Sequence, residues 1–128
     1  MPRLHVSLGK LYYSEKGLYY ESVQAYKKAI ELDGSFLDAR MGLAEVYEDK
    51  GLYQEAIGEY RKVVEADGKN TGALYNLALV YEKVDAKESI SLWERYIALA
   101  GPLPSEKDWV DVAKLHLRKL RNQQEKSN

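Results

Sequence analysis

A near-duplication is the feature of this chain that most restricts its possible folds. The segment "KGLYYESVQAYKKAIELDG", which begins at Lys16, recurs as "KGLYQEAIGEYRKVVEADG", which begins at Lys50. With an offset of 34 residues, ten of the 21 aligned pairs between residues 15–35 and 49–69 are identical. A fixed period of this length is typical of repeat proteins, in which one supersecondary unit recurs along the chain.

The period continues beyond these two segments. Three tyrosines are spaced by 34 residues, and a histidine follows after 35: Tyr13, Tyr47, Tyr81 and His116. Glycine recurs near the end of each unit, at positions 34, 68 and 101. The sequence therefore predicts repeat units at about residues 3–36, 37–70 and 71–104.

Each unit has the apolar spacing of two helices joined by a short turn. In the middle unit, apolar residues recur every three or four positions in two stripes: Leu43, Ala44, Val46 and Tyr47, then Ala56, Ile57, Tyr60, Val63 and Val64. Gly51 lies between the stripes, where helices often end in a left-handed residue. We expect helices at about residues 3–15, 19–32, 36–49, 53–66, 70–83, 86–99 and 105–122, followed by a polar tail at 123–128.

The middle unit resembles the tetratricopeptide repeat. Leu43, Ala44 and Tyr47 match the pattern L-G-x2-Y, with alanine in place of glycine. Ala56 and Tyr60 then match A-x3-F, with tyrosine in place of phenylalanine.

This resemblance covers roughly residues 3–121 and implies the fold. It implies an all-α, right-handed superhelical α-solenoid of three helix–turn–helix units plus a C-terminal capping helix at 105–122, all in a single domain over residues 1–128. In the first unit two registers are open, because either Tyr12 or Tyr13 can fill the tyrosine position of the pattern.

The chain offers no motif for catalysis. It has no cysteine, which excludes thiolate chemistry, and its net charge of −1 gives no basic footprint for nucleic acid. His116 occupies the place of the repeated tyrosine, so we interpret it as an aromatic substitute rather than a metal ligand; His5 lies far away at the other end of the chain. We therefore expect no enzyme activity, no cofactor and no metal.

No segment has the features of a membrane span or a secretory signal. No apolar run approaches the ~18 residues that a bilayer-spanning helix needs, and the first residues lack a charged-then-apolar pattern. We expect no membrane insertion and a cytoplasmic location, with a fragment of a periplasmic protein as the alternative.

The resemblance implies that the first helices of successive units line a concave groove. Positions off the packing stripes form the candidate partner-binding groove: Asp38, Met41, Glu45, Glu48, Tyr75, Asn76, Leu79, Glu82, Val110, Lys114 and Leu117. Several of these are apolar residues that the packing pattern does not require, and an exposed apolar strip with a charged rim is typical of a partner site.

The sequence therefore predicts a non-catalytic protein–protein interaction module, a scaffold that binds a peptide segment or partner protein in this groove. The strip changes from acidic in the middle unit to basic in the last helix, so we expect the basic end of the peptide to lie toward Asp38, Glu45 and Glu48.

A known subset of the family grips the C-terminal carboxylate of heat-shock chaperones with a clamp of Lys, Asn, Asn, Lys and Arg. The corresponding positions here hold Val6, Lys10, Gly42, Gly72 and Asn76. We therefore do not expect this chain to bind such chaperone tails.

A second hypothesis comes from the first helix. Leu4, Val6, Leu8 and Leu11 have no upstream unit to cover them. The alternative function is a self-associating structural element, a possible homo-oligomer, or a fragment of a longer array that stacks through its N-terminal helix.

Overall fold

The computed structural model describes residues 1–127, apart from the side chain of Lys16. These residues contain no strand and form seven α-helices and one 3-10 turn: α1 (Pro2–Lys16), α2 (Tyr19–Leu32), α3 (Leu37–Asp49), α4 (Tyr53–Ala66), α5 (Thr71–Tyr81), α6 (Ala86–Ala100), η1 (Pro104–Glu106) and α7 (Lys107–Ser127). The predicted all-α class is confirmed. The chain divides into two compact units, unit 1 (Met1–Gly68) and unit 2 (Lys69–Asn128), which are described separately. That residues 1–128 form a single domain stays a prediction.

The first six helices begin and end within two residues of their predicted bounds. The last helix differs, because a 3-10 turn precedes it and it continues to Ser127 instead of ending at 122. Residues 123–127, predicted to be a polar tail after the helix, are polar but form its last turns, so the predicted helix end at 122 is wrong. They include Gln, Glu and Lys, which have high helix propensity, and no glycine or proline interrupts them. Position 128 lies outside the described residues.

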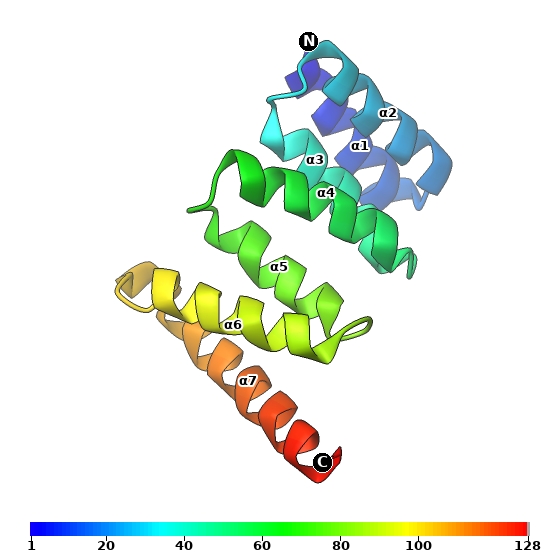
Figure 1. Ribbon diagram of the computed structural model, residues 1–128. Helices are drawn as coiled ribbons and strands as arrows, with labels where there is room; N and C mark the ends of the chain where they lie inside the picture. The colour runs from blue at the N-terminus through cyan, green and yellow to red at the C-terminus, as the bar shows by residue number, and fades with distance from the viewer. Residues whose placement is uncertain (128) are drawn as a thin grey trace. The chain divides into compact units, whose positions relative to one another are not determined.

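Unit 1 consists of the helical hairpins α1–α2 and α3–α4. Helix α1 packs against α2 and α3, α2 packs against α3, and α3 packs against α4 (Figure 1). Its core contains the predicted stripes, and most of their members are buried: Leu43, Ala44, Val46, Ala56, Ile57, Tyr60, Val63 and Val64. Tyr47 is partly buried against this core.

The turns inside the two hairpins of unit 1 depend on glycine. Gly17 and Gly51 have φ angles of +61° and +76°, a left-handed conformation that costs glycine little. Each turn is closed by a backbone hydrogen bond of 2.9 Å, from Leu18 N to Tyr12 O in the first and from Leu52 N to Tyr47 O in the second. Tyr12 is thus the counterpart of Tyr47.

A buried serine supports the same register for α1. The hydroxyl of Ser22 donates to the carbonyl of Gly9 at 2.8 Å, and that of Ser89 donates to the carbonyl of Ala78 at 2.8 Å. Gly9 therefore corresponds to Ala78, the small residue of the third unit. Of the two registers left open by the sequence, the structure has the one with an extra residue before the first turn.

The ring of Tyr26 fills the space where α1, α2 and α3 meet in unit 1. Tyr26 is 3% exposed. A Cβ atom placed on Gly9 would come within 2.9 Å of this ring, and one placed on Gly42 would overlap it. Two glycines on neighbouring helices therefore make room for one aromatic side chain.

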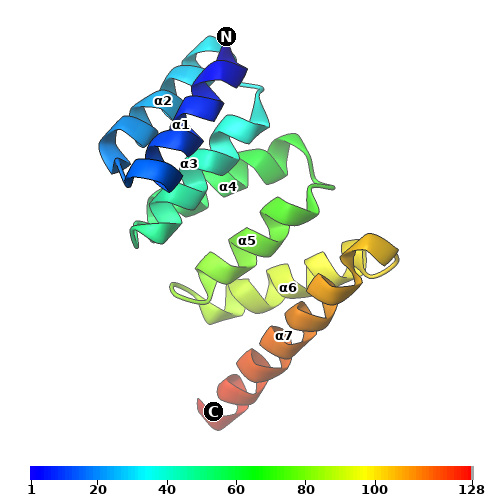
Figure 2. The same cartoon turned by 180° about the vertical axis from the view of Figure 1, so that it is seen from behind.

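Unit 2 consists of α5, α6 and α7. Helix α5 packs against α6, and α6 packs against α7 (Figure 2). The core of unit 2 is centred on Trp93 and Tyr96 of α6, which are at most 1% exposed. Asn70 accepts a hydrogen bond from Ala73 N at 3.0 Å and caps α5, as the polar turn before this helix predicts. Within residues 1–127, no helix has both the length and the apolar character that crossing a membrane requires.

Candidate functional site

Helix α3 carries the candidate groove residues of unit 1. Asp38 and Glu45 are exposed, whereas Met41 and Glu48 are half-buried. Lys10 of α1 is close enough to Glu45 for its charge to act on that carboxyl group. The outward side of α3 in unit 1 is therefore acidic, with a single apolar group, Met41, among the four candidates.

The two glutamates of this surface are partly desolvated. Burial raises the pKa of Glu45, Lys10 opposes this rise, and the nearby Glu48 adds to it. Burial also raises the pKa of Glu48, although the hydroxyl of Tyr60 donates to its Oε1 at 2.8 Å and lowers that pKa. Because Tyr60 belongs to α4, Glu48 holds the two helices of its repeat together. It is a structural residue as well as a candidate for ligand contact.

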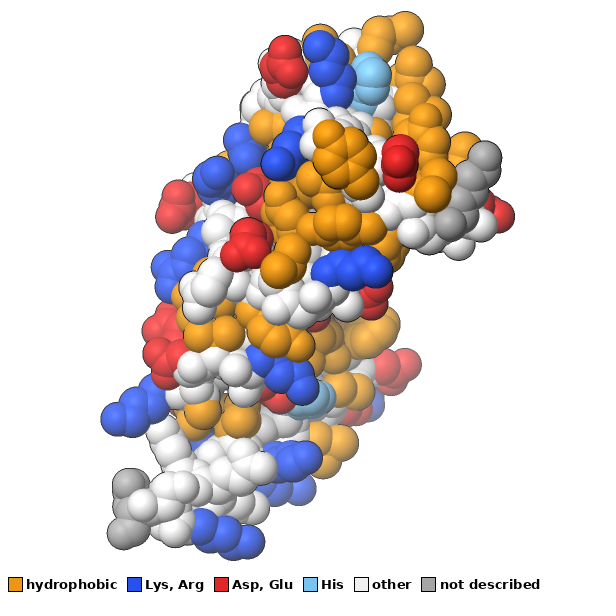
Figure 3. All heavy atoms as spheres, turned by 90° about the vertical axis from the view of Figure 1, so that its right-hand side faces the viewer, with side chains coloured by type: hydrophobic (Ala, Val, Ile, Leu, Met, Phe, Trp, Pro, Cys, Tyr) orange, Lys and Arg blue, Asp and Glu red, His pale blue; other side chains and the backbone are white. Residues whose placement is uncertain are grey.

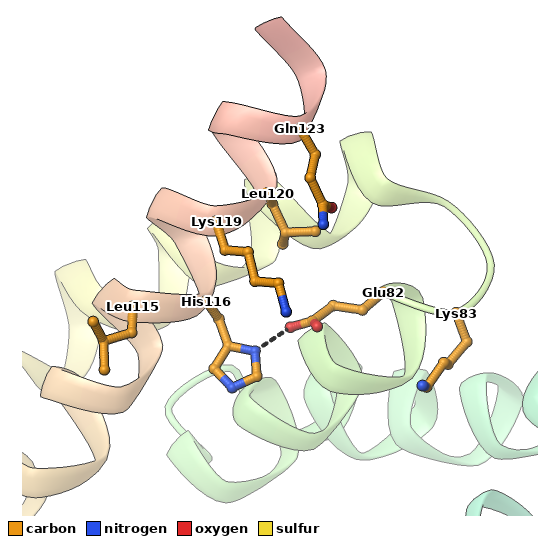
Figure 4. Close-up of a pocket in the computed structure, with 7 residues that line it drawn as sticks. All are labelled: Glu82, Lys83, Leu115, His116, Lys119, Leu120 and Gln123. Atoms are coloured by element: carbon orange, nitrogen blue, oxygen red, sulfur yellow. Dashed lines mark hydrogen bonds and ion pairs between the residues drawn. The ribbon is translucent and has the colours of Figure 1, made fainter. Parts of the chain in front are cut away.

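In unit 2, Glu82 has a comparable role at the end of α5. Its Oε2 accepts a hydrogen bond of 2.9 Å from the indole Nε1 of Trp93, and the Nδ1 atom of His116 lies 2.7 Å from the same oxygen. Figure 4 shows His116 and Lys119 of α7 pointing toward Glu82. A single carboxylate therefore joins α5 to both α6 and α7, and it lines a cavity of about 300 Å³.

His116 behaves as an aromatic core substitute, as its position in the repeat predicts. Its ring lies 5.2 Å from the ring of Trp93, its side chain is 33% exposed, and its Nδ1 atom is occupied by Glu82. Among residues 1–127 no group of three or more His, Asp or Glu side chains is placed so that it could hold a metal ion.

Tyr75, Asn76 and Leu79 lie on α5 and are half-buried. The ring of Tyr75 is at the centre of an aromatic cluster. Its centroid lies 5.0 Å from Trp93, 5.3 Å from Tyr96 and 5.4 Å from Trp109, and every pair is close to perpendicular. This edge-to-face geometry is favourable for aromatic pairs. Tyr75 is therefore held in place by the core of unit 2 while part of its surface remains open.

Two candidate residues on α7 were placed on the wrong face. Val110 and Leu117 are buried, at 5% and 8% exposed. The apolar spacing of α5 predicts a packing stripe on this helix that contains Trp109, Val112, Ala113 and His116; Ala113 is buried, but Trp109 and Val112 are 55% and 36% exposed. Lys114 is exposed. Helix α7 packs against α6, and no later helix within residues 1–127 covers the face that carries Trp109. Only one narrow stripe of α7 is therefore buried.

A second cavity in unit 2, of about 230 Å³, lies beside the aromatic cluster and was not predicted from the sequence. Tyr75, Tyr96, Trp109 and Glu106 line it, together with Gly72 and Asn76. Tyr96 donates from its hydroxyl to Glu106 Oε1 at 3.1 Å. Burial, followed by this bond and the charge of Glu106, raises the pKa of Tyr96. Trp109 at the start of α7 is the sequence signal that could have indicated this cavity, but the spacing assigned it to the packing stripe.

These observations define a class: an all-α repeat protein built from two-helix units that share equivalent capping, packing and hydrogen-bonding positions. A model of the tetratricopeptide repeat matches residues 2–36 and 37–70, which together exceed half of the chain. The chain belongs to the tetratricopeptide repeat family. The matched segments coincide with the first two predicted repeat units. No curated protein sequence matches the chain.

Solved structures with the same fold share little sequence with the chain. The Yersinia enterocolitica type III secretion translocator chaperone SycD has a TM-score of 0.87 at 20% identity, over 96% of this chain and 85% of that one. Pseudomonas aeruginosa PcrH, in its complex with PopD, has a TM-score of 0.86 at 19% identity, over 95% and 92%. The TPR2B domain of yeast Sti1 has a TM-score of 0.84 at 15% identity, over 95% and 97%. At these identities the likeness shows the fold alone.

Proposed function

We propose that this chain is a non-catalytic interaction module that binds a peptide segment of a partner protein through the first helices of its repeats. The observation that carries the proposal is the outward side of α5, where Tyr75 and Leu79 remain partly exposed, Tyr75 although its ring also packs in the aromatic cluster of unit 2. Tyr75 is held rigidly by three aromatic neighbours. A rigid aromatic side chain with an open surface is typical of a binding hot spot.

Structures of the same fold support this proposal. SycD has been solved in complex with a peptide of the translocator YopD, PcrH with the chaperone binding region of PopD, and the Sti1 domain as a TPR2B-domain:pHsp70 complex. We extend peptide binding to this chain as a class of activity, without assigning any of these ligands to it.

The ligand contacts are proposed for each unit separately. In unit 1 they are Asp38, Met41, Glu45 and Glu48, which suit a basic stretch of peptide. In unit 2 they are Tyr75, Asn76, Leu79, Glu82 and Lys114. Val110 and Leu117 are not proposed as ligand contacts, because both side chains are buried. A chaperone C-terminal carboxylate is not expected as the ligand, because Val6 and Gly42, at two of the clamp positions, are buried and offer no side-chain donor.

The experiment is a binding assay with a partner captured from native lysate, identified, and reduced to a labelled peptide. Tyr75→Ala combined with Leu79→Ala should weaken binding at least tenfold, because truncating hot-spot residues costs about 2 kcal/mol or more each. The matched control combines Leu32→Ala with Leu52→Ala, two leucines outside this surface that are 46% and 38% exposed. Circular dichroism checks that each variant is folded.

A second pair of variants keeps the test valid if the aromatic cluster fails to fold without Tyr75. Asp38→Lys and Glu45→Lys change only exposed side chains of unit 1. They should weaken binding of a basic peptide, and the effect should diminish as salt is added. Unchanged affinity in both the apolar and the charge-reversed variants would exclude the proposed surface.

Self-association is the second candidate function. Of the four residues of α1 that were expected to be uncovered, Leu4 and Leu11 are 50% and 47% exposed, but Val6 is in the core of unit 1 at 5% exposed, so that part of the expectation is wrong. Met1 and Tyr20 of the same unit are 79% and 67% exposed. Figure 3 shows hydrophobic side chains gathered over the N-terminal unit. SycD has also been solved in a form described as an alternative dimer.

A further inference from the structure

The aromatic cavity of unit 2 contains one carboxylate and no cation to neutralise it. Glu106 is partly buried in the wall of this cavity, and the hydrogen bond that the structure of residues 1–127 gives its carboxylate comes from the neutral hydroxyl of Tyr96, at 3.1 Å. The adjacent Lys107 is directed elsewhere, since its Nζ lies 3.2 Å from Asp111. Among the side chains that the structure describes, no lysine, arginine or histidine lines the cavity.

Three aromatic residues also line the cavity, Tyr75, Tyr96 and Trp109, beside Thr71, Gly72 and Asn76 of α5. Tyr75 and Trp109 lie 5.4 Å apart with their planes at 78°, so they present two surfaces at nearly a right angle. Trp109 is 55% exposed beside the cavity. Tryptophan is the aromatic side chain that binds cations best, because its ring face carries a partial negative charge.

We propose that this cavity binds the cationic side chain of a lysine or arginine in the peptide ligand. Its volume of about 230 Å³ is below the range of pockets for drug-sized ligands and suits one long side chain. Trp109 and Tyr75 contact the methylenes and the charged group, and Glu106 supplies the counter-charge. The inference rests on the proposed function, which it deepens by specifying one ligand residue.

Electrostatics favours a cation over an apolar side chain of the same length. An apolar side chain that filled the cavity would remove water from the Glu106 carboxylate without replacing it by a positive charge, and that desolvation is costly. A cation removes the same water but pairs with the carboxylate and with the ring faces. The Glu106–Tyr96 hydrogen bond holds the carboxylate in place before the ligand arrives.

The test uses the blocked amino acid N-acetyl-lysine methylamide as a probe, with the norleucine analogue as its uncharged isostere. The chain contains only two tryptophans, so the indole N–H signals in a nitrogen-15 spectrum separate Trp109 at the cavity from the buried Trp93. The lysine probe should shift the Trp109 signal and bind between about twofold and thirtyfold more tightly than norleucine, the range expected for a cation–π contact.

Two variants locate the effect. Glu106→Gln removes the charge but keeps an oxygen that can accept from Tyr96, and it should bring lysine binding close to that of norleucine. Trp109→Leu should weaken lysine binding while keeping an apolar wall. Because this variant lacks the Trp109 indole signal, binding to it is followed through the backbone amides of residues 72–76. The control is Glu125→Gln, which makes the same charge change at an exposed position of α7 outside this cavity.

Equal or tighter binding of norleucine would overturn the inference, as would a Trp109 signal that the lysine probe does not move. The outcome is separable from that of the proposed function. If the probe fails while a partner peptide binds in a Tyr75- and Leu79-dependent manner, this inference alone is wrong. If the probe binds as expected and no partner peptide binds, the interaction-module proposal is wrong and the cation site stands.

Discussion

At the scale of single residues, the chain uses glycine for two different purposes. Gly17 and Gly51 adopt positive φ angles that a side chain disfavours, and these could be predicted from the sequence because they end a periodic apolar stripe. Gly42 lies inside a helix, where the sequence suggests only a loss of stability relative to alanine. In the structure, the Tyr26 ring lies against Gly42 and occupies the space that a Cβ atom would need.

We predict opposite effects for two mid-helix glycines of unit 1. Gly42→Ala would force a methyl group into the Tyr26 ring and should lower the free energy of unfolding by about 1–3 kcal/mol, as overpacking does. Gly58→Ala meets no atom within 4 Å and should raise that free energy by up to about 1 kcal/mol. Urea unfolding followed by circular dichroism measures both, and a stabilising Gly42→Ala would contradict this packing.

The hydrogen-bonding partners of Glu48 and Glu82 could not be predicted from the sequence. Their spacing on the first helices correctly kept them off the apolar stripes, but their partners, Tyr60 and Trp93, lie on the following helix. Such a contact depends on how two helices pack, which the period of one helix does not specify. The sequence therefore indicated a candidate surface but did not show that two of its members also link helices.

At the scale of elements, the sequence predicted six helices closely and oriented the seventh wrongly. The reason is that α7 carries two possible apolar stripes. One contains Trp109, Val112 and His116, by analogy with α5, and the other contains Val110 and Leu117. The analogy fails because α5 packs on the helix that follows it, whereas α7 packs on α6, which precedes it. The neighbouring helix selects the stripe that is buried.

Two leucines of α7 test this orientation. Leu117 is 8% exposed and Leu115 is 59% exposed. Leu117→Ala should lower the free energy of unfolding of unit 2 by about 2–4 kcal/mol, because it leaves a cavity against α6. Leu115→Ala should change it by less than about 0.5 kcal/mol, as is usual for surface positions. Denaturant unfolding followed by tryptophan fluorescence compares them, and a larger loss for Leu115→Ala than for Leu117→Ala would contradict this orientation of α7.

At the scale of the whole molecule, the period predicted a repeat array, the apolar spacing predicted its helices, and the match of Leu43, Ala44, Tyr47, Ala56 and Tyr60 to the repeat pattern predicted the family. It could not predict which exposed surface has a partner, because every repeat presents the same kinds of faces. The exposed fraction of each side chain, which only the structure provides, identifies two candidate surfaces: the apolar surface of α1 and the α5 surface proposed to bind peptide. The two surfaces therefore lead to different predictions for the intact chain.

If the self-association hypothesis holds, the scattering mass should rise with protein concentration. Leu4→Lys combined with Leu11→Lys should restore the monomer mass, because two charges would be desolvated in the contact. Leu32→Lys provides the control, since Leu32 is 46% exposed on α2 and does not belong to the α1 surface. Light scattering across a concentration series makes the comparison. A wild-type mass that stays monomeric at every concentration rules out this second function.

The placement of the aromatic residues gives each unit its own optical signature. Both tryptophans belong to unit 2, where Trp93 is fully buried and donates to Glu82, whereas eight of the eleven tyrosines belong to unit 1. Fluorescence excited at the red edge of the absorption band, which selects tryptophan, therefore reports only on residues 69–128. The tyrosine contribution to the near-ultraviolet spectrum comes mainly from residues 1–68. Melting of the two halves can thus be recorded in one unlabelled sample, and a difference between the two curves would measure how cooperatively the halves unfold.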